Sequence, residues 1–357
     1  MGTRRSFLAG LTSATCVPAI GWGAVGNPTA LSAAMTRDGH FLLAGLTASG
    51  DIAFRVPLPA RGHAAAAHPM VAEAVAIARR PGTFAMVIDC ATGRVIQSIH
   101  APKGRHFYGH GAFSADGSLL FTPENEVATG QGRIGVWDRG LGYARIDEFA
   151  SGGIGPHEIL RLPTGDLAVA NGGIRTHPET GREKLNLDSM QANLSVYSPT
   201  GTLRDRAEVA AEYRHNSLRH IAVSSEGVVI CGFQWQGDPY DPPPLVALYD
   251  GKGTLYPCQI EDDVLRRLDG YIGSVCAVGQ TRLVASSPRG GRVLTFNMPG
   301  EQTGVYPALD VCGLSAAPGG DCLVTNGLGT VYALASTGLQ RIRQHDLAFD
   351  NHLVALL

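Results

Sequence analysis

Short apolar strands recur along this chain in pairs, each pair joined by a turn that carries glycine or aspartate. Copies begin at Gly109, Pro156, Arg219, Gly273 and Cys312. The segment from residue 351 to the C-terminus starts in the same way, and a looser copy starts at residue 62, which makes seven. Alternation of this kind around tight turns predicts antiparallel β-hairpins.

A second pair of strands follows most of the hairpins, for example over residues 134–138, 194–198 and 245–250. Four strands per copy, with about 47 residues for each of seven copies between residues 31 and 357, match the blades of a propeller. Residues 31–58 supply three strands without an innermost one, and residues 351–356 supply the missing strand. The sequence predicts an all-β, seven-bladed β-propeller over residues 27–357, closed by its N- and C-terminal strands.

Composition agrees with a folded, turn-rich chain. Of 357 residues, 46 are glycine and 21 proline, 44% are hydrophobic, and the net charge is −2. Disorder needs a more charged and less apolar chain, and there is no basic run for nucleic acid or anionic membrane. The six cysteines after residue 26 show no metal-binding spacing, and we assign no disulfide.

The first residues resemble an export signal rather than part of the fold. Arg4 and Arg5 precede Ser6, Phe7 and a weakly apolar run, as in twin-arginine signal peptides. We expect a signal over residues 1–26, cleaved near residues 23–26, a periplasmic location, and no membrane span in the mature chain.

Alignment of the seven hairpins places a histidine at the first position of the innermost strand in five blades. The other two blades have Ser274 and Gly313 there. Innermost strands line the central channel, so we expect these imidazoles to converge at one end of it. The five residues are His63, His110, His157, His220 and His352. Histidines outside this register, namely His40, His68, His100, His106, His215 and His345, are expected on the surface.

A second register, 14 residues further along, predicts polar loops around the histidines. The rim residues predicted in this way are Glu124, Asn125, Asn171, Arg175, His177, Gln234, Trp235 and Arg289. Carboxylates and amides such as Glu124, Glu158 and Asn171 are expected to fix imidazole tautomers. Arg175, His177 and Arg289 either hold an anion or bridge loops.

Several functions fit this arrangement. Clustered neutral imidazoles favour a transition metal, iron or copper, and the arrangement resembles the copper-binding propeller of nitrous oxide reductase. In the main alternative the histidines are structural and the rim loops bind a partner protein. A third alternative is a metal-dependent redox or hydrolytic enzyme, although the sequence contains no established catalytic motif.

Longer motifs carry a family resemblance. Residues 107–111, 155–158, 171–178, 185–188 and 232–237 resemble the bacterial family catalogued as domain of unknown function 1513. The resemblance implies an exported propeller encoded beside imelysin-type iron-uptake proteins and dihaem peroxidase-like proteins. It therefore implies a role in periplasmic iron acquisition, with iron-uptake proteins as partners.

Overall fold

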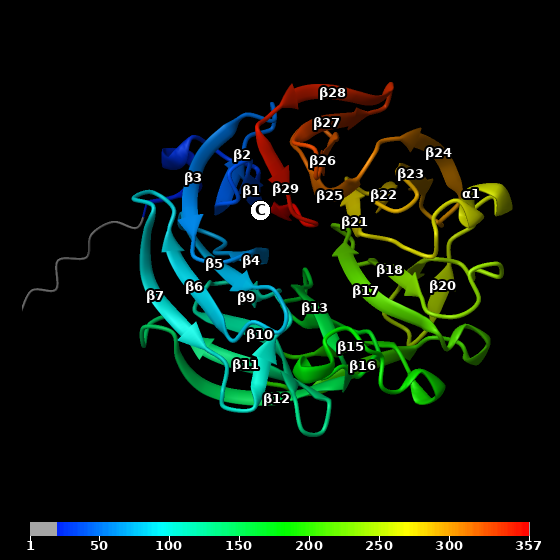
Figure 1. Cartoon of the computed structure of the whole chain (residues 1–357), viewed down its shortest axis with the longest axis horizontal. Coiled ribbons are helices and arrows are strands. Elements are labelled where there is room, and N and C mark those ends of the chain that lie inside the picture. The colour runs from blue at the N-terminus through cyan, green and yellow to red at the C-terminus, as the bar shows by residue number, and fades with distance from the viewer. Residues whose placement is uncertain (1–19, 357) are drawn as a thin grey trace, which may run out of the picture.

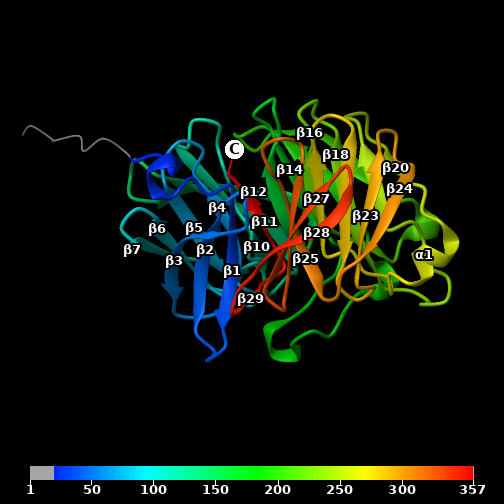
Figure 2. The ribbon, with the colours of Figure 1, turned by 90° about the horizontal axis from the view of Figure 1, so that it is seen from above.

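A computed structural model describes residues 20–356, and these form seven antiparallel sheets arranged around a central axis (Figure 1). Seen from above, the strands run between the two faces of the ring (Figure 2). In each of the second to seventh sheets, the strands follow one another from the axis outward in the order in which they occur along the chain. The prediction of a seven-bladed β-propeller is confirmed.

The strands of each blade are as follows. The first blade contains β29 (Leu347–Phe349), β30 (Val354–Ala355), β1 (Ala30–Thr36), β2 (Phe41–Leu46) and β3 (Ile52–Leu58); the second contains β4 (Gly62–Ala67), β5 (Glu73–Ala78), β6 (Phe84–Asp89) and β7 (Arg94–His100). The third contains β8 (Arg105–Phe107), β9 (Ala112–Phe113), β10 (Leu119–Glu126), β11 (Gln131–Asp138) and β12 (Ala144–Ile154); the fourth contains β13 (Pro156–Arg161), β14 (Leu167–Asn171), β15 (Asn193–Tyr197) and β16 (Leu203–Glu208). The fifth contains β17 (Asn216–Val223), β18 (Val229–Trp235), β19 (Val246–Tyr249) and β20 (Leu255–Pro257); the sixth contains β21 (Ser274–Val278), β22 (Arg282–Ser287), β23 (Arg292–Asn297) and β24 (Gln302–Pro307); the seventh contains β25 (Val311–Ala316), β26 (Cys322–Asn326), β27 (Thr330–Ala335) and β28 (Gly338–Gln344).

Helices are short in the described part of the chain. They are 3₁₀ turns at Trp22–Val25, Pro178–Thr180, Leu187–Ser189 and Ala211–Tyr213, and one α-helix, α1 (Asp262–Arg266). None of them has the length and apolar character that a membrane crossing requires. The hydrophobic core instead lies between blades, because each sheet buries both faces against its neighbours. Leu194 of the fourth blade, for example, shares a buried cluster with Phe233 of the fifth.

The two ends of the chain close the ring. Strand β1 pairs with β2 on one side and with β29 and β30 on the other, so the first and last strands lie side by side (Figure 1). The expected closing strand over residues 351–356 is only partly correct. Pairing covers Leu347–Phe349 and Val354–Ala355, and the backbone between them leaves the ladder to carry Asp350 and His352.

Most of the predicted signal peptide lies outside the described residues. From residue 20 onward the chain packs on the propeller: the Trp22 side chain is buried, and its Nε1 donates a hydrogen bond to the His68 carbonyl at 2.9 Å. Trp22 lies before the expected cleavage region at residues 23–26. The six cysteines of the described chain are all free and buried.

Candidate functional site

The repeated histidines lie where the innermost strand of their blade is irregular; His63 and His157 are at the start of that strand, as the sequence alignment suggested, whereas His110, His220 and His352 are not. In the second, fourth and fifth blades the pairing register shifts beside the histidine. In the third and first blades the inner strand is split in two, and the histidine lies in the gap. Bulges and breaks of this kind redirect a side chain. The residues are His63, His157 and His220 at bulges, and His110 and His352 in breaks.

The five imidazoles form one continuous cluster. The ring centroid of His63 lies 5.0 Å from that of His110, 5.8 Å from that of His157 and 4.6 Å from that of His352. His110 lies 5.1 Å from His157 and 4.6 Å from His352. His220 lies 5.0 Å from both His157 and His352. Every histidine of the register therefore contacts at least two others.

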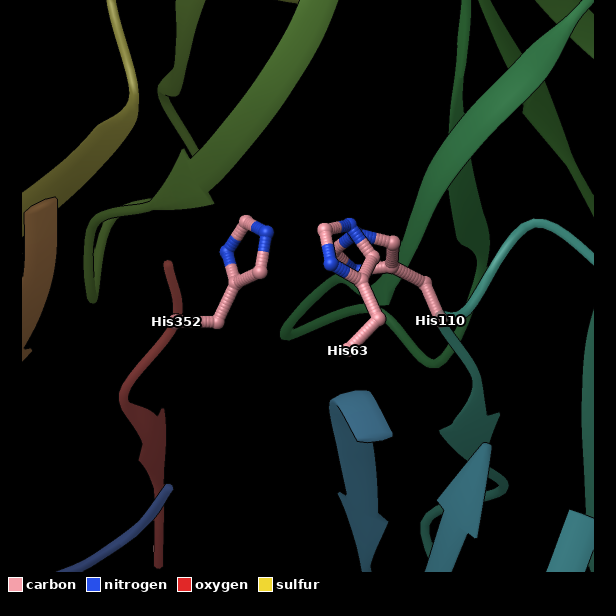
Figure 3. A group of neighbouring side chains, drawn as sticks. All are labelled: His63, His110 and His352. Atoms are coloured by element: carbon pink, nitrogen blue, oxygen red, sulfur yellow. The ribbon is translucent and has the colours of Figure 1, made fainter. Parts of the chain in front are cut away.

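Three of the rings present nitrogen atoms to a common space. His63, His110 and His352 converge there from the second, third and first blades (Figure 3). One nitrogen from each lies within 4.8 Å of the other two. Since metal–imidazole bonds measure about 2.0–2.1 Å, nitrogens on opposite sides of one ion are about 4.2 Å apart. Small side-chain rotations would therefore let the three rings share an ion.

The same three histidines have nitrogen atoms without a hydrogen-bond partner. His110 Nε2 and His352 Nε2 are buried and unpaired within residues 20–356, and His63 Nδ1 is buried without a hydrogen bond but faces Asp350 Oδ1 at 3.6 Å. Buried polar atoms nearly always have a partner, because leaving one unsatisfied costs about 1–3 kcal/mol. The three lone pairs or N–H groups accordingly point to an additional occupant of the cluster.

Glu158 contributes a carboxylate to the cluster, as the sequence predicted. Its Oε2 lies 3.3 Å from His220 Nδ1 and accepts a hydrogen bond from the Ile221 amide at 3.2 Å. Its Oε1 lies 3.6 Å from His110 Nδ1. Together with His157, the pair His110 and Glu158 makes a second group whose possible ligand atoms lie within 4.8 Å of one another. Glu158 thus orients two rings and is itself within reach of an ion.

The environment favours the neutral form of four imidazoles of the cluster, those of His63, His110, His157 and His352. Burial lowers the pKa of His110, His157 and His352 well below the ordinary value, and the charges of neighbouring histidines lower it further. Burial also lowers the pKa of His63, against an opposing effect of Asp350, whose Oδ1 lies 3.6 Å from Nδ1. Neutral imidazole is the form that binds metals.

Two cavities meet at the cluster. The vestibule, a pocket of about 280 Å³, is lined by His63, His157 and His220 and by side chains of the surrounding loops. The channel, a cavity of about 300 Å³, is lined by the inner strands and by His110, His220 and His352. The imidazoles therefore separate one cavity from the other, with His220 exposed to both.

Three of the predicted rim residues line the vestibule. Gln234 and Trp235 at the end of β18, and Arg289 after β22, lie beside the histidines. The Arg289 guanidinium stacks 4.6 Å from the centre of the Tyr271 ring. The loops after the second strand of the fourth, fifth and sixth blades thus reach the face that the sequence indicated.

The prediction for Glu124, Asn125 and Asn171 is wrong, because these side chains are buried within their blades. Glu124 is paired with Arg145 at 2.8 Å and with Arg105 at 3.3 Å. The Asn125 amide bonds His106 Nε2 at 3.1 Å. Asn171 bonds Ser151 and Asn193. None of the three contacts the histidine cluster, so Glu124 and Asn171 do not fix its tautomers.

Arg175 and His177 also lie outside the vestibule; Arg175 bridges two loops, one of the two roles that the sequence allowed, and His177 stabilises its own loop. Arg175 Nη2 donates a hydrogen bond to the Ala128 carbonyl at 2.9 Å, which bridges the third and fourth blades. His177 Nδ1 accepts a hydrogen bond from the Glu179 amide at the start of a 3₁₀ turn. Of the three residues considered for an anion, only Arg289 is placed to contact one.

Sequence reasoning missed most of the cations of the vestibule. Arg79, Arg80 and Arg219 line it, as does Tyr108. Arg79 and Arg80 occupy the loop of the second blade that corresponds to the rim loops of the other blades, and this position was the available clue. Arg219 directly precedes His220, in the bulge of β17.

Two histidines expected on the surface are buried. His68 Nδ1 accepts hydrogen bonds from the amides of Met70 and Val71 at 3.1 and 3.2 Å, which stabilises a turn. His106 lies 2% exposed beside Asn125. Their rings are satisfied locally, so their burial is structural.

The fold and the cluster define this chain as a β-propeller with a histidine-lined constriction in its central channel. A family model described as "Protein of unknown function (DUF1513)" matches residues 56–356, and the chain belongs to that family. A search of curated proteins found no match.

Solved structures share the fold at low sequence identity. A chain of the "Crystal Structure of Mitotic Checkpoint Complex" aligns with a TM-score of 0.57 and 12% identity, over 78% of this chain and 74% of that one. The "C-Terminal WD40 Domain Of Sif2" aligns with a TM-score of 0.56 and 11% identity, over 86% of this chain and 78% of that one. These likenesses establish the propeller architecture alone.

Proposed function

We propose that the histidine cluster binds one transition-metal ion, iron or copper, at the constriction of the channel. The observation that carries this proposal is the convergence of His63, His110 and His352: one nitrogen of each ring lies within 4.8 Å of the other two, and each ring has a buried nitrogen without a hydrogen-bond partner. A metal would satisfy all three at once. It would also explain why five blades place an imidazole at the same register.

The donor set fits the proposed metals. In the described part of the chain, one converging group consists of three imidazoles and the other of two imidazoles and one carboxylate, and neither contains cysteine. Imidazole with carboxylate suits iron and copper, whereas structural zinc and iron–sulfur sites commonly use thiolates. Glu158 would orient His110 and His220, in the way that carboxylates hold metal-bound imidazoles.

The cellular role that we propose is metal handling outside the cytoplasm. The twin-arginine pattern supports export, and the family resemblance supports iron acquisition beside imelysin-type iron-uptake proteins. A propeller with a closed ring and a central ligand is a suitable carrier or sensor of a metal for such partners. A redox or hydrolytic role would require a catalytic group, and we assign none.

A protein-interaction scaffold is the second candidate. The structural similarity to a WD40 domain and to a chain of a multiprotein complex supports it. So does Tyr240, which is 90% exposed in the loop that follows Trp235. Tyrosine and tryptophan are common anchors of interfaces. In this alternative the histidines contribute only to packing.

Metal analysis of the folded protein separates the two candidates. We expect wild-type protein, exposed to iron or copper and then desalted, to retain about one ion per chain. The double variant His110→Gln/His352→Gln should retain less than about a tenth of that while keeping its circular dichroism spectrum, because two of three unpartnered donors are lost. The matched control is His100→Gln, which changes an exposed histidine. Wild-type protein that retains neither metal would overturn the proposal and leave the scaffold.

A further inference from the structure

The vestibule concentrates positive charge in a protein whose net charge is −2. Six cationic side chains line it, and among residues 20–356 no aspartate or glutamate does. The six are Arg79, Arg80, Arg182, Lys184, Arg219 and Arg289. Like charges around a pocket of about 280 Å³ repel one another.

Five of these cations have no carboxylate within 4.0 Å among the described residues; only Arg289 has one, Asp269 at 3.8 Å. Several enclosed arginines elsewhere in the molecule are paired with carboxylates. Arg105 and Arg145, for example, bind Glu124 and Glu148. Outside the vestibule, Arg133 also has a buried Nε without a hydrogen-bond partner. What distinguishes the vestibule is that it gathers five cations without a carboxylate partner among the described residues around one cavity.

Arg219 shows the imbalance most clearly. Its Nε atom is buried without a hydrogen-bond partner, and burial lowers the pKa of its guanidinium group. Arg80 is also largely enclosed, and its single side-chain bond goes to the neutral hydroxyl group of Thr176. Enclosing an unpaired charge is costly unless a partner arrives.

An independent observation comes from Tyr108. Its side chain is only 4% exposed, its hydroxyl oxygen is buried without a partner, and it lines the same pocket. Burial raises the pKa of this hydroxyl group, so it remains an O–H donor at neutral pH. Guanidinium, ammonium and phenol groups can all donate hydrogen bonds, and a negatively charged acceptor would satisfy them together while balancing the cationic charge.

We propose that the vestibule binds a small, multiply charged oxyanion through Arg80, Arg219 and Tyr108, with Arg79, Arg182 and Lys184 supplying further charge. Arginine matches the paired oxygens of carboxylate and phosphate groups. The pocket volume lies at the lower end of ligand sites, which suits a di- or tricarboxylate or a phosphate. This site uses residues other than the three nitrogens proposed for the metal and is tested in metal-free protein.

Calorimetric titration of chelator-treated, desalted protein with citrate, inorganic phosphate and acetate tests the proposal. We expect one citrate or one phosphate per chain, with acetate at least about tenfold weaker because it carries a single charge. The stronger of citrate and phosphate identifies the preferred oxyanion. Affinity should fall steeply with added sodium chloride, since salt screens the charges.

Variants locate the binding. Arg219→Gln should weaken the preferred anion by about tenfold or more and should raise the melting temperature of the anion-free protein, because an unpaired charge is removed. Arg182→Gln/Lys184→Gln, at exposed positions, should weaken binding without affecting the fold. Arg204→Gln, remote from the vestibule and near Asp166, is the matched control. Equal binding by wild type and both vestibule variants, or no binding of citrate or phosphate at millimolar concentration, would overturn the proposal.

Discussion

Acid should destabilise the metal-free propeller through its buried histidines. Burial lowers the pKa of His110, His157 and His352 well below the ordinary value, whereas in the unfolded chain each titrates near 6.5. Below about pH 6.5 the unfolded state therefore binds more protons than the folded state, and stability falls as the pH falls. Above that pH both states are neutral and the effect disappears.

The size of the effect follows from the number of buried rings. Each imidazole that stays neutral in the folded state contributes a slope that approaches about 1.4 kcal/mol per pH unit below pH 6.5. The three rings together approach about 4 kcal/mol per pH unit, against a total stability of about 5–15 kcal/mol for a typical domain. Acidification from pH 7.5 to 5 should thus come close to unfolding the chelated protein.

Urea denaturation of chelator-treated protein at pH 8, 7, 6 and 5 measures this slope. We expect His110→Gln to reduce the slope below pH 6.5 by about 1.4 kcal/mol per pH unit, since glutamine does not titrate. His100→Gln, at an exposed position, should leave the slope unchanged. The reasoning is wrong if stability is flat between pH 7 and 5, or if the two variants behave alike.

Two further predictions concern the fold and the rejected rim residues. Deletion of residues 346–357 removes β29 and β30 and the burial of Leu347, Phe349 and Leu353. It should therefore lower the free energy of unfolding by at least about 5 kcal/mol and expose the edge of β1. An unchanged melting temperature and no aggregation by light scattering would contradict the closure of the ring. Glu124→Gln leaves Arg105 and Arg145 without their buried carboxylate, which should cost about 3–5 kcal/mol in urea denaturation while metal content stays at the wild-type value. If this variant lost metal at unchanged stability, Glu124 would have to belong to the metal site after all.

Repetition explains what the sequence could predict. Seven similar hairpins reveal the blade count, and alignment of those hairpins exposes a shared register even though the contacts between blades are long-range. The convergence of His63 and His352, nearly 300 residues apart, follows from ring closure alone. The role of Glu158 could be predicted from the sequence because Glu158 directly follows His157, one of the aligned histidines.

Counting along the chain failed where side-chain direction matters. Fourteen residues after an aligned position, Glu124 and Asn171 fall within or at the end of strands and turn into the blade, whereas Gln234 turns toward the axis. Successive side chains of a strand point to opposite faces, and a bulge in the preceding strand shifts this alternation, so the two together decide the direction of a side chain. The vestibule cations were missed for another reason. An arginine such as Arg219 stands out only when the structure shows that no carboxylate lies beside it.

The position of the imidazoles between two cavities has a kinetic consequence. An ion that approaches from the vestibule crosses the field of six cations before it meets His63. A free divalent cation is repelled on that route, so its association is slow and is accelerated by salt. A negatively charged metal complex is attracted instead and arrives faster at low ionic strength. If the histidine cluster binds a metal as proposed, the propeller would discriminate between forms of that metal by their rate of capture, before any ligand bond is made.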